Sequence, residues 1–412
     1  MLVHCLVVVY AFLALGLLAM LALNLSVLNP VAQTMKGFSV TDIYYHVLQD
    51  YETPDTSRIV TIVDMTDIQD RYQLAEMLDQ IEAFNPKVVG VDIVFEGYKD
   101  EMGDMRITRS ARQWDNTVFS YRLRDWKDTS TGYATEIHSF FIDPDDSVKI
   151  SEGFTNYERV LYGGLKRKAN LNRKVCGEPR NALVAEVIMR YTDGQFEGNI
   201  TDDVNINFSP KVFRVVPYDS IAYHRDWIED HIVLYGATHE LADMHYTPIG
   251  EIAGIELLAY TIQTMLEQTE VRTPSTTATI ILSFLIVLVT RIGRQAYLKW
   301  ARSFKSEFVV FFLTTTFVIG ILLFFWTAIL VGAAFIMFTK TSISLNLGWA
   351  LAAIPFLYGA NEFAILTTNY FERKRKPAEK EEKLEQQPLT EINQETMSAT
   401  EGADAGETPS TL

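Results

Sequence analysis

The sequence predicts an α/β domain outside the cytoplasm, with a mostly parallel sheet and flanking helices, attached to four α-helical transmembrane spans. Two features of the 412 residues carry this prediction. Long apolar runs lie only at the two ends of the chain, and the more polar middle contains a strand–helix–strand pattern. The average composition, 48% hydrophobic and 21% charged, hides this division because it is typical of a globular protein.

The N-terminal run, residues 2–29, contains no acidic or basic residue except His4 and is long enough to cross a hydrocarbon core of about 30 Å. A cleaved signal peptide is the alternative, and it would have a basic start, a shorter apolar core and a small-x-small cleavage site. None of these is clear, so we predict a retained anchor over residues 1–29. Because no basic residue precedes the run, a start codon further upstream stays open.

Three further spans are expected within residues 275–371, at about 275–290, 308–328 and 344–367. The second of these runs continues in apolar residues to Phe338, so its tail forms either a turn or a helix extension. Residues 372–412 are rich in Glu, Lys, Gln and Thr, which predicts a disordered cytoplasmic tail.

Basic residues give the orientation, because short cytoplasmic loops carry an excess of Lys and Arg. The loop 291–307 holds five basic residues and residues 373–376 hold four, whereas only Lys340 lies between the last two spans. These segments therefore face the cytoplasm, and residues 30–274 form the extracytoplasmic domain. Its single cysteine, Cys176, excludes a disulfide inside it, which suits a bacterial periplasm and hence the inner membrane.

A βαβ unit is expected at the start of this domain. Residues 58–64 form a β-branched run, and residues 73–81 place apolar side chains at helical spacing. Residues 87–95 are nearly all apolar, as in a strand that helices cover on both faces. The unit fits a right-handed crossover in a parallel sheet.

Further elements follow from the same patterns. Strands are expected at 116–122, 136–142 and 231–237, with one or two more within 202–216. Helices are expected around Leu183–Ile188 and around 255–265, where Ile255, Leu258, Ile262 and Met265 share one face.

The stretch "HIVLYGATHELADMHYTPIG", residues 231–250, contains three histidines, one aspartate, Asp243, and one glutamate, Glu240. Its histidines lack a metal-ligand spacing, and no HExxH, G-x-S-x-G or P-loop motif occurs in the chain. We therefore expect no metal, no cofactor and no catalytic residue. The net charge of −16 argues against nucleic-acid binding.

Three aspartates are candidates for ligand binding, because ligands of open α/β sheets bind beyond the carboxyl ends of the strands. Asp64 and Asp243 each follow a predicted strand, and Asp92 lies within one. An unpaired carboxylate in an apolar strand is unfavourable, so Asp92 should pair with Arg71 or an amide cluster, or bind a cation. The alternative is structural: the aspartates satisfy loop N–H groups.

Glu362 is the one acidic residue expected inside a span, and intramembrane carboxylates are candidates for function. The alternative is a position at the membrane interface near the basic segment 373–376. The spans show neither repeated halves nor a line of polar residues, which argues against a transporter or channel.

Several short motifs, in this order, resemble the CHASE type-two family of extracytoplasmic sensor domains. "VVGVDIVFEGYKDEMGD" resembles the I-x-x-D-I-x-F…G-D block, "EGFTN" resembles G-F-x-N, and the stretch from His231 resembles I-V-x-I-G-A-T…D-x-x-x-T-P…P-G. The resemblance covers the three ligand-binding candidates Asp64, Asp92 and Asp243. It implies motif roles for eight other residues: Asp42, Phe95, Gly103, Asp104, Gly236, Thr247, Pro248 and Gly254.

Members of that family precede bacterial kinases and cyclases, with one span before the sensor domain and three after it. Two departures stand out here. The family's Trp-Pro-x-Pro-Arg segment is reduced to "DIQDRYQ", in which only Arg71 remains, and no kinase or cyclase follows the last span.

The resemblance implies a receptor-like membrane protein whose domain detects an unknown periplasmic cue. Its partners would be the lipid bilayer, a separate cytoplasmic or membrane signalling protein, and possible further copies in a homo-oligomer. The predicted helix at 254–268 runs almost directly into the second span and would be the mechanical link. A non-catalytic envelope scaffold is the alternative, and a periplasmic enzyme would need a nucleophile that the sequence does not reveal.

Overall fold

The computed structural model describes residues 2–24, 41–42, 44–45, 53–68, 70–142, 150–156, 165–357 and 359–370. These residues divide into two compact units. The domain unit lies within Ala22–Ser283 and Phe311–Trp349, and the helix unit within Met1–Leu21, Phe284–Val310 and Ala350–Leu412.

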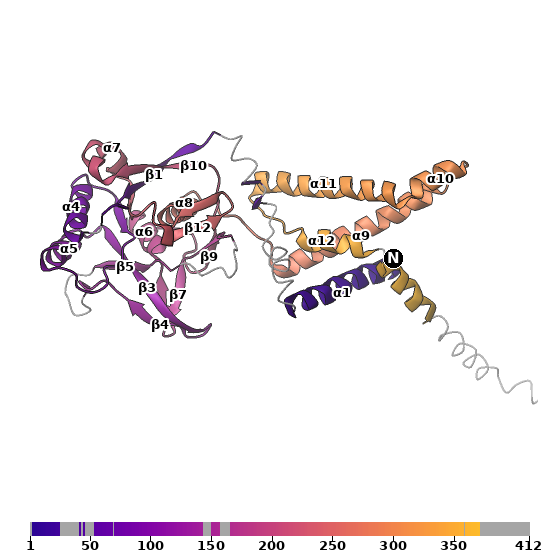
Figure 1. The fold of residues 1–412 in the computed structure, drawn as a ribbon, viewed down its shortest axis with the longest axis horizontal. Coiled ribbons are helices and arrows are strands. Elements are labelled where there is room, and N and C mark those ends of the chain that lie inside the picture. The colour runs from indigo at the N-terminus through magenta and orange to yellow at the C-terminus, as the bar shows by residue number, and fades with distance from the viewer. Residues whose placement is uncertain are drawn as a thin grey trace, which may run out of the picture. The chain divides into compact units, whose positions relative to one another are not determined.

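The helices and strands follow the chain in the order drawn in Figure 1. The helices are α1 (Leu2–Asn24), α4 (Arg71–Glu82), α5 (Glu101–Gln113), α6 (Leu183–Tyr191), α7 (Arg225–Ile228), α8 (Gly254–Leu266), α9 (Thr276–Ala301), α10 (Glu307–Thr314), α11 (Thr316–Thr341) and α12 (Gly348–Ala353). The strands are β1 (Asp55–Asp64), β2 (Val88–Val91), β3 (Thr117–Asp128), β4 (Gly132–Ile137), β5 (Ser151–Phe154), β6 (Lys168–Asn170), β7 (Asn172–Val175), β8 (Glu178–Asn181), β9 (Asp203–Asn205), β10 (Lys211–Pro217), β11 (Ile232–Gly236), β12 (Met244–Thr247) and β13 (Gly250–Ala253).

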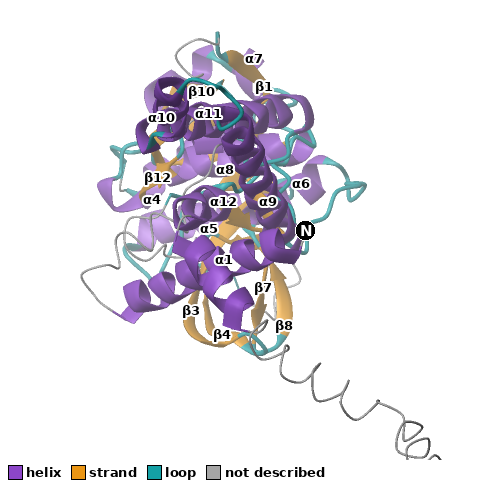
Figure 2. Ribbon diagram, turned by 90° about the vertical axis from the view of Figure 1, so that its right-hand side faces the viewer, coloured by secondary structure: helices purple, strands orange, loops and turns teal. Residues whose placement is uncertain are grey.

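The domain unit is built on a mixed sheet with the strand order β10-β1-β11-β2-β3-β4-β7-β8, in which β5 also pairs with β3. The strands from β10 to β3 and the pair β3–β5 are parallel, which confirms the mixed α/β sheet with flanking helices. β4 and β8 turn antiparallel to their neighbours β3 and β7. Figure 2 shows β3, β4, β7 and β8 grouped at one end of the sheet.

Both faces of the central strands are buried. On β1, Val60 and Ile62 join a core with α6 and α8, whereas Val63 joins a core with α4 and α5. On β11, Leu234 and Tyr235 divide between these cores in the same way. A strand between two helical layers needs apolar side chains at every position, which explains the continuous apolar runs of the sequence.

Two strand predictions were wrong. The strand expected at 87–95 ends at Val91, so Asp92 follows the strand instead of lying inside it. The strand expected at 136–142 is only the end of β4, which stops at Ile137. Helix α5 was missed because its buried face consists largely of small or polar residues, which give little apolar periodicity: Gly103, Asp104, Ile107, Ser110 and Ala111.

Among the described residues, two helices are long and apolar enough to cross a membrane, namely α9 and α11. A third candidate is the pair Gly348–Phe356 and Gly359–Tyr370, whose halves are bent by 63°. The N-terminal run forms α1, within which Val3–Leu18 is a shorter apolar helix. Of the four predicted spans, therefore, two are found as continuous membrane-length helices. The run after Thr316 continues as helix to Thr341, which settles the predicted alternative of turn or extension.

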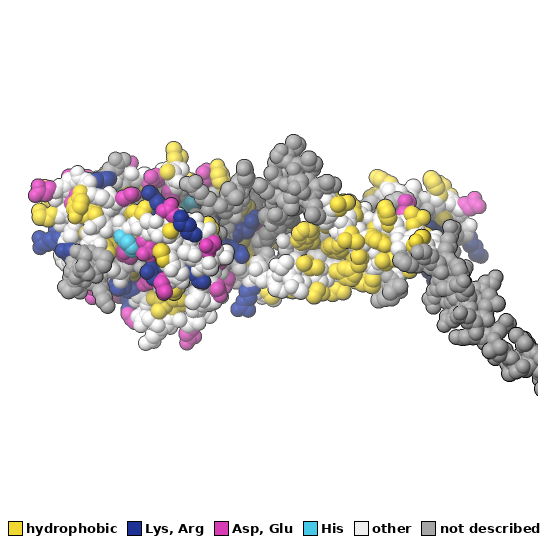
Figure 3. Space-filling view, turned by 90° about the horizontal axis from the view of Figure 1, so that it is seen from below, with side chains coloured by type: hydrophobic (Ala, Val, Ile, Leu, Met, Phe, Trp, Pro, Cys, Tyr) yellow, Lys and Arg dark blue, Asp and Glu magenta, His cyan; other side chains and the backbone are white. Residues whose placement is uncertain are grey.

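The helical segments and the α/β domain differ in the side chains that they expose. Large apolar side chains such as Phe308, Phe311, Phe317 and Phe324 are exposed on α10 and α11. Figure 3 shows apolar side chains gathered over the helical segments and charged side chains distributed over the α/β domain. Exposed apolar surface of this extent is expected where lipid is the solvent.

Candidate functional site

The carboxyl ends of three neighbouring strands place two predicted aspartates at one edge of the sheet. β1 ends at Asp64, which pairs in register with Gly236 at the end of β11. The next strand, β2, ends at Val91, and the amide of Asp92 donates to the carbonyl of Tyr235 at 2.9 Å. Asp243 lies in the loop after β11. We call Asp64, Asp92, Gly236 and Asp243 the carboxyl edge.

One carboxylate oxygen of Asp64 is engaged by hydrogen bonds within the protein. Its Oδ1 accepts hydrogen bonds from the amide and hydroxyl of Thr66, at 3.1 and 2.6 Å, and from the amide of Thr238 at 3.0 Å. Burial would raise the pKa of Asp64, but these hydrogen bonds outweigh it and hold the pKa below its ordinary value. The structural interpretation therefore fits Asp64, which joins the loops after β1 and β11.

Asp92 has the opposite environment. No hydrogen bond to its carboxylate is found among the described residues, and the predicted partner Arg71 binds Asp104 instead, so that pairing was wrong. Burial, and next the nearby carboxylate of Asp243, raise the pKa of Asp92 to about 7, although Arg122 opposes the shift. The prediction placed Asp92 inside a strand, whereas its position just beyond the strand explains how the side chain remains partly exposed.

Asp243 contacts the first turn of α8. A Cβ atom on Gly254, the first residue of this helix, would lie only 2.2 Å from Oδ2 of Asp243. Glycine at this position therefore allows the carboxylate to approach the N-terminal end of the helix, where a negative charge is favourable. Oδ1 of Asp243 also lies 3.6 Å from Nε2 of His245.

The absence of a side chain at Gly236 likewise leaves room for Asp92 and for α8. A Cβ atom there would lie 3.2 Å from Cβ of Asp92 and 2.8 Å from Cδ1 of Ile255 in α8. The end of β11 thus packs closely against both Asp92 and the helix that leaves the carboxyl edge.

Thr247 ends β12 and Pro248 begins the turn of the β12–β13 hairpin, and both residues are buried. The hydroxyl of Thr247 donates to the carbonyl of Gly250 at 2.7 Å. Because β13 leads directly into α8, this turn fixes the start of the helix and matches the structural interpretation.

The three histidines of the stretch 231–250 do not converge. Nδ1 of His231 contacts the carbonyl of Glu229 at 2.7 Å, Nδ1 of His239 contacts the hydroxyl of Thr238 at 2.6 Å, and His245 lies beside Asp243. Within the described ranges, no group of three or more His, Cys, Asp or Glu side chains has an arrangement that could hold a metal ion.

A second set of motif residues lies between α4 and α5. Arg71, 2% exposed, donates through Nη1 to Oδ1 of Asp104 at 2.5 Å and to the carbonyl of Gly97 at 2.7 Å. The remaining carboxylate oxygen of Asp104 accepts from the amide of Lys99 at 2.9 Å. Burial would raise the pKa of Asp104, but these donors keep it below its ordinary value.

Phe95 and Gly103 both pack against Arg71 of the Arg71–Asp104 pair. The guanidinium of Arg71 lies 5.8 Å from the ring centre of Phe95 and 4.9 Å from that of Phe140. A Cβ atom on Gly103 would lie 2.9 Å from Cβ of Arg71, so glycine lets the two helices approach.

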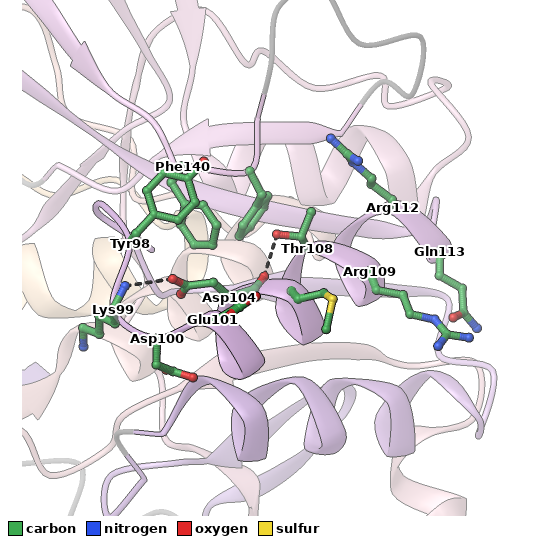
Figure 4. A pocket seen from close by; sticks show the side chains of 12 residues that line it. Tyr98, Lys99, Asp100, Glu101, Asp104, Thr108, Arg109, Arg112, Gln113 and Phe140 are labelled. Atoms are coloured by element: carbon green, nitrogen blue, oxygen red, sulfur yellow. Dashed lines mark hydrogen bonds between the residues drawn. The ribbon is translucent and has the colours of Figure 1, made fainter.

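An open groove of about 1060 Å³ lies beside this pair, and sequence reasoning missed it. Figure 4 shows Tyr98 and Phe140 on one side, Asp104 and Thr108 of α5 at the centre, and Arg109 and Arg112 further along the helix. The signal was weak because most of these residues are polar or charged and form no recognised motif.

The remaining motif residues support the framework. Asp42 accepts a two-pronged ion pair from Arg167, at 2.8 Å from Nε and 2.5 Å from Nη2. A Cβ atom on Gly153 would lie 2.4 Å from the amide nitrogen of Leu183, so glycine allows β5 to pack on α6. Asn156 binds both backbone polar groups of Leu123, at 2.5 and 2.8 Å.

Comparison with known proteins identifies the family. A search of the curated proteins gave no match, and neither did a search of the solved structures. The model of the CHASE2 domain, however, matches residues 6–292, which is well over half of the chain and includes every motif residue discussed above. The chain therefore belongs to the CHASE2 family of sensory extracytoplasmic domains.

Proposed function

We propose that this chain is a membrane-embedded receptor whose α/β domain, within residues 30–274, detects a cue at the carboxyl edge and relays it to a separate signalling protein. The domain lies in the bacterial periplasm, and four spans anchor it in the inner membrane. Residues 1–29 contain the first span, residues 275–371 the other three, and residues 372–412 the cytoplasmic tail. Family membership and the two membrane-length helices support this proposal.

The observation that carries the proposal is the connection from the carboxyl edge to α11. The carboxylate of Asp243 contacts Gly254 at the start of α8, and the chain after α8 reaches Arg272. The amide of Arg272 donates to Ser342 at 2.9 Å, and its carbonyl accepts from Ser344 at 2.8 Å. These bonds tie the segment between α8 and α9 to the residues that follow α11.

The carboxylates at the carboxyl edge repel one another, and a bound cue could relieve this repulsion. Asp92 has neighbouring carboxylates in Asp243 and Glu240, and among the described residues only Arg122 offsets them. A cation, a proton or a polar ligand with donors would relieve this repulsion. Such a cue would favour one arrangement of the loop and of α8, as differential binding requires.

The relay is tested on the full chain in lipid nanodiscs by hydrogen exchange. Asp92→Asn removes the charge without changing the shape of the side chain. It should alter exchange at residues 268–275 and 342–344 as well as at the mutated loop. The matched control is Asp226→Asn, which removes an exposed carboxylate on α7. Changes confined to the carboxyl edge in Asp92→Asn would contradict a relay.

The orientation is tested with reporter fusions. A fusion after Asp202 should report a periplasmic position, and fusions at Lys299 and Pro388 should report cytoplasmic positions. A periplasmic signal at Lys299 would overturn the proposed topology.

An envelope scaffold is the second candidate, favoured by the open groove beside α5 with its exposed Tyr98 and its arginines. Mixed aromatic and charged surfaces of this kind are typical of protein contacts. A scaffold requires no change at residues 342–344, so the exchange experiment separates the two candidates.

A further inference from the structure

The helix unit contains a basic pocket of about 640 Å³ that the sensory role does not use. It is lined by His4 of α1, by α9 and the residue after it between Arg291 and Arg302, and by Asn361. Arg291, Arg294, Lys299 and Arg302 contribute four positive charges to the lining, which contains no aspartate or glutamate. Glu362, the acidic residue singled out in the sequence, is exposed and is not part of the lining.

Contacts within the unit hold the three helical segments around this pocket. The rings of Phe12 in α1 and Phe284 in α9 stack with centres 6.3 Å apart. The hydroxyl of Tyr10 donates to Thr367 at 3.0 Å. Arg291 donates through Nη2 to the side-chain oxygen of Asn361.

Arg291 is the central feature, because it is 4% exposed but has no carboxylate partner among the described residues. Its Nε has no hydrogen-bond acceptor within the described part of the chain, and neither has Nδ1 of His4 a partner there. A buried guanidinium without a counter-charge is strongly unfavourable. The pocket therefore offers an anion a buried positive charge and unused hydrogen-bonding groups.

The positive-inside rule explains only part of this arrangement. It accounts for exposed basic residues beside a span, and Lys299, Arg302 and Lys305 are exposed. It does not require a buried arginine. Arg291, Arg294, Leu298 and Arg302 follow one another at intervals of three or four residues, which places them on one face of the helix.

We propose that this pocket binds a phosphate anion, either the phosphodiester of an anionic lipid headgroup or free phosphate. The planar guanidinium of Arg291 would form charge-assisted hydrogen bonds to two phosphate oxygens, which a carboxamide such as that of Asn361 cannot replace. Basic pockets between spans on the cytoplasmic side are typical sites for such headgroups. The inference is independent of the proposed sensory function.

The test uses the full chain in phosphatidylcholine nanodiscs, with either phosphatidylglycerol in the bilayer or inorganic phosphate in the buffer. Retention of phosphatidylglycerol is measured by native mass spectrometry, and phosphate binding by calorimetry. Arg291→Gln should weaken binding at least about fivefold, the contribution of one basic residue near an anionic surface. Lys305→Gln is the matched control, because Lys305 belongs to the same basic loop but does not line the pocket.

The experiments with phosphatidylglycerol and with inorganic phosphate distinguish a lipid headgroup from the free ion. Loss of phosphatidylglycerol in Arg291→Gln but not in Lys305→Gln supports the lipid site, and the same pattern with inorganic phosphate supports a site for the free ion. Equal losses in both variants, or no preference for either probe over phosphatidylcholine alone, would overturn the pocket. If Arg291→Gln does not fold, Arg302→Gln at the exposed rim replaces it, and binding no weaker than that of Lys305→Gln then overturns the proposal.

Discussion

The Arg71–Asp104 pair and the carboxyl edge both contain acidic motif residues, but they differ in how those charges are compensated. Asp104 has a guanidinium at 2.5 Å and a backbone amide at 2.9 Å, and it is 5% exposed. The carboxylate of Asp92 has no hydrogen bond among the described residues, and its nearest charged neighbours include Asp243 and Glu240. The pKa of Asp104 is accordingly lowered, and that of Asp92 is raised to about 7.

This difference indicates that Asp104 and Asp92, although both belong to the family motif, have different roles. A buried, fully paired carboxylate holds two helices together, and its protonation state changes little near neutral pH. A poorly compensated carboxylate is sensitive to protons, cations and hydrogen-bond donors, which is the property that a detecting site needs. Removing the partner of Asp104 should therefore lower the free energy of unfolding, whereas removing the charge of Asp92 should raise it.

The largest effect is expected from Arg71→Ala. This change leaves Asp104 buried without its partner, so the free energy of unfolding should fall by about 3–5 kcal/mol. Thermal or denaturant unfolding of the detergent-solubilised full chain measures it, with Arg109→Ala on the exposed face of α5 as the control. If Arg71→Ala proved as stable as Arg109→Ala, the pair would not be the structural element inferred above.

The next largest effect is expected from Gly254→Ala. The added Cβ would lie 2.2 Å from Oδ2 of Asp243, so the loop or the start of α8 must move, at a cost of about 1–3 kcal/mol. Combining it with Asp243→Ala removes the clash and should recover part of the loss in the same unfolding measurement. Additive losses in the double variant would show that the two residues do not interact.

Asp92→Asn should cause a smaller change in the free energy of unfolding, and this change should be an increase. The pKa of Asp92 is about 7 in the folded chain but near 4 in an unfolded chain, so the folded state binds more protons between these values. The contribution of Asp92 to stability therefore falls as pH rises from about 4 to about 7 and stays low above that range.

Asn cannot ionise, so Asp92→Asn should be more stable than the unsubstituted chain at pH values above about 7, by an amount on the order of 1 kcal/mol. The difference should shrink as pH falls towards about 4. Melting temperatures across this pH range measure it, with Asp226→Asn as the control. A loss of stability in Asp92→Asn at every pH would indicate a compensating partner and remove the contrast between the regions.

The smallest effect is expected from His239→Gln. This side chain is 81% exposed and lies 3.9 Å from Asp64, so the free energy of unfolding should change by less than about 0.5 kcal/mol. Chelator should leave the melting temperature of the full chain unchanged. Stoichiometric zinc that is lost in His239→Gln would contradict the description of this stretch as a loop without metal.

Local patterns in the sequence predicted much of the framework. β1, β11, α4, α6 and α8 all appear close to their expected positions, because apolar side chains repeat at the spacing of the element and both faces of the strands are covered. The apolar run after residue 308 was also recognised, although a break at Thr315 divides it into α10 and α11. A few residues that are close in sequence were sufficient to predict these features.

The sequence by itself therefore determined an α/β domain between apolar segments, with Asp64 and Asp243 beyond its strands. The tertiary structure decided which carboxylate is compensated. Arg71 pairs with Asp104, 33 residues away, instead of Asp92, because α4 and α5 pack together at Gly103 while the chain leaves β2 beside Gly236. The buried arginine pocket likewise depends on three helical segments that are distant in sequence. Electrostatic compensation depends on contacts across the fold, and local periodicity carries no information about them.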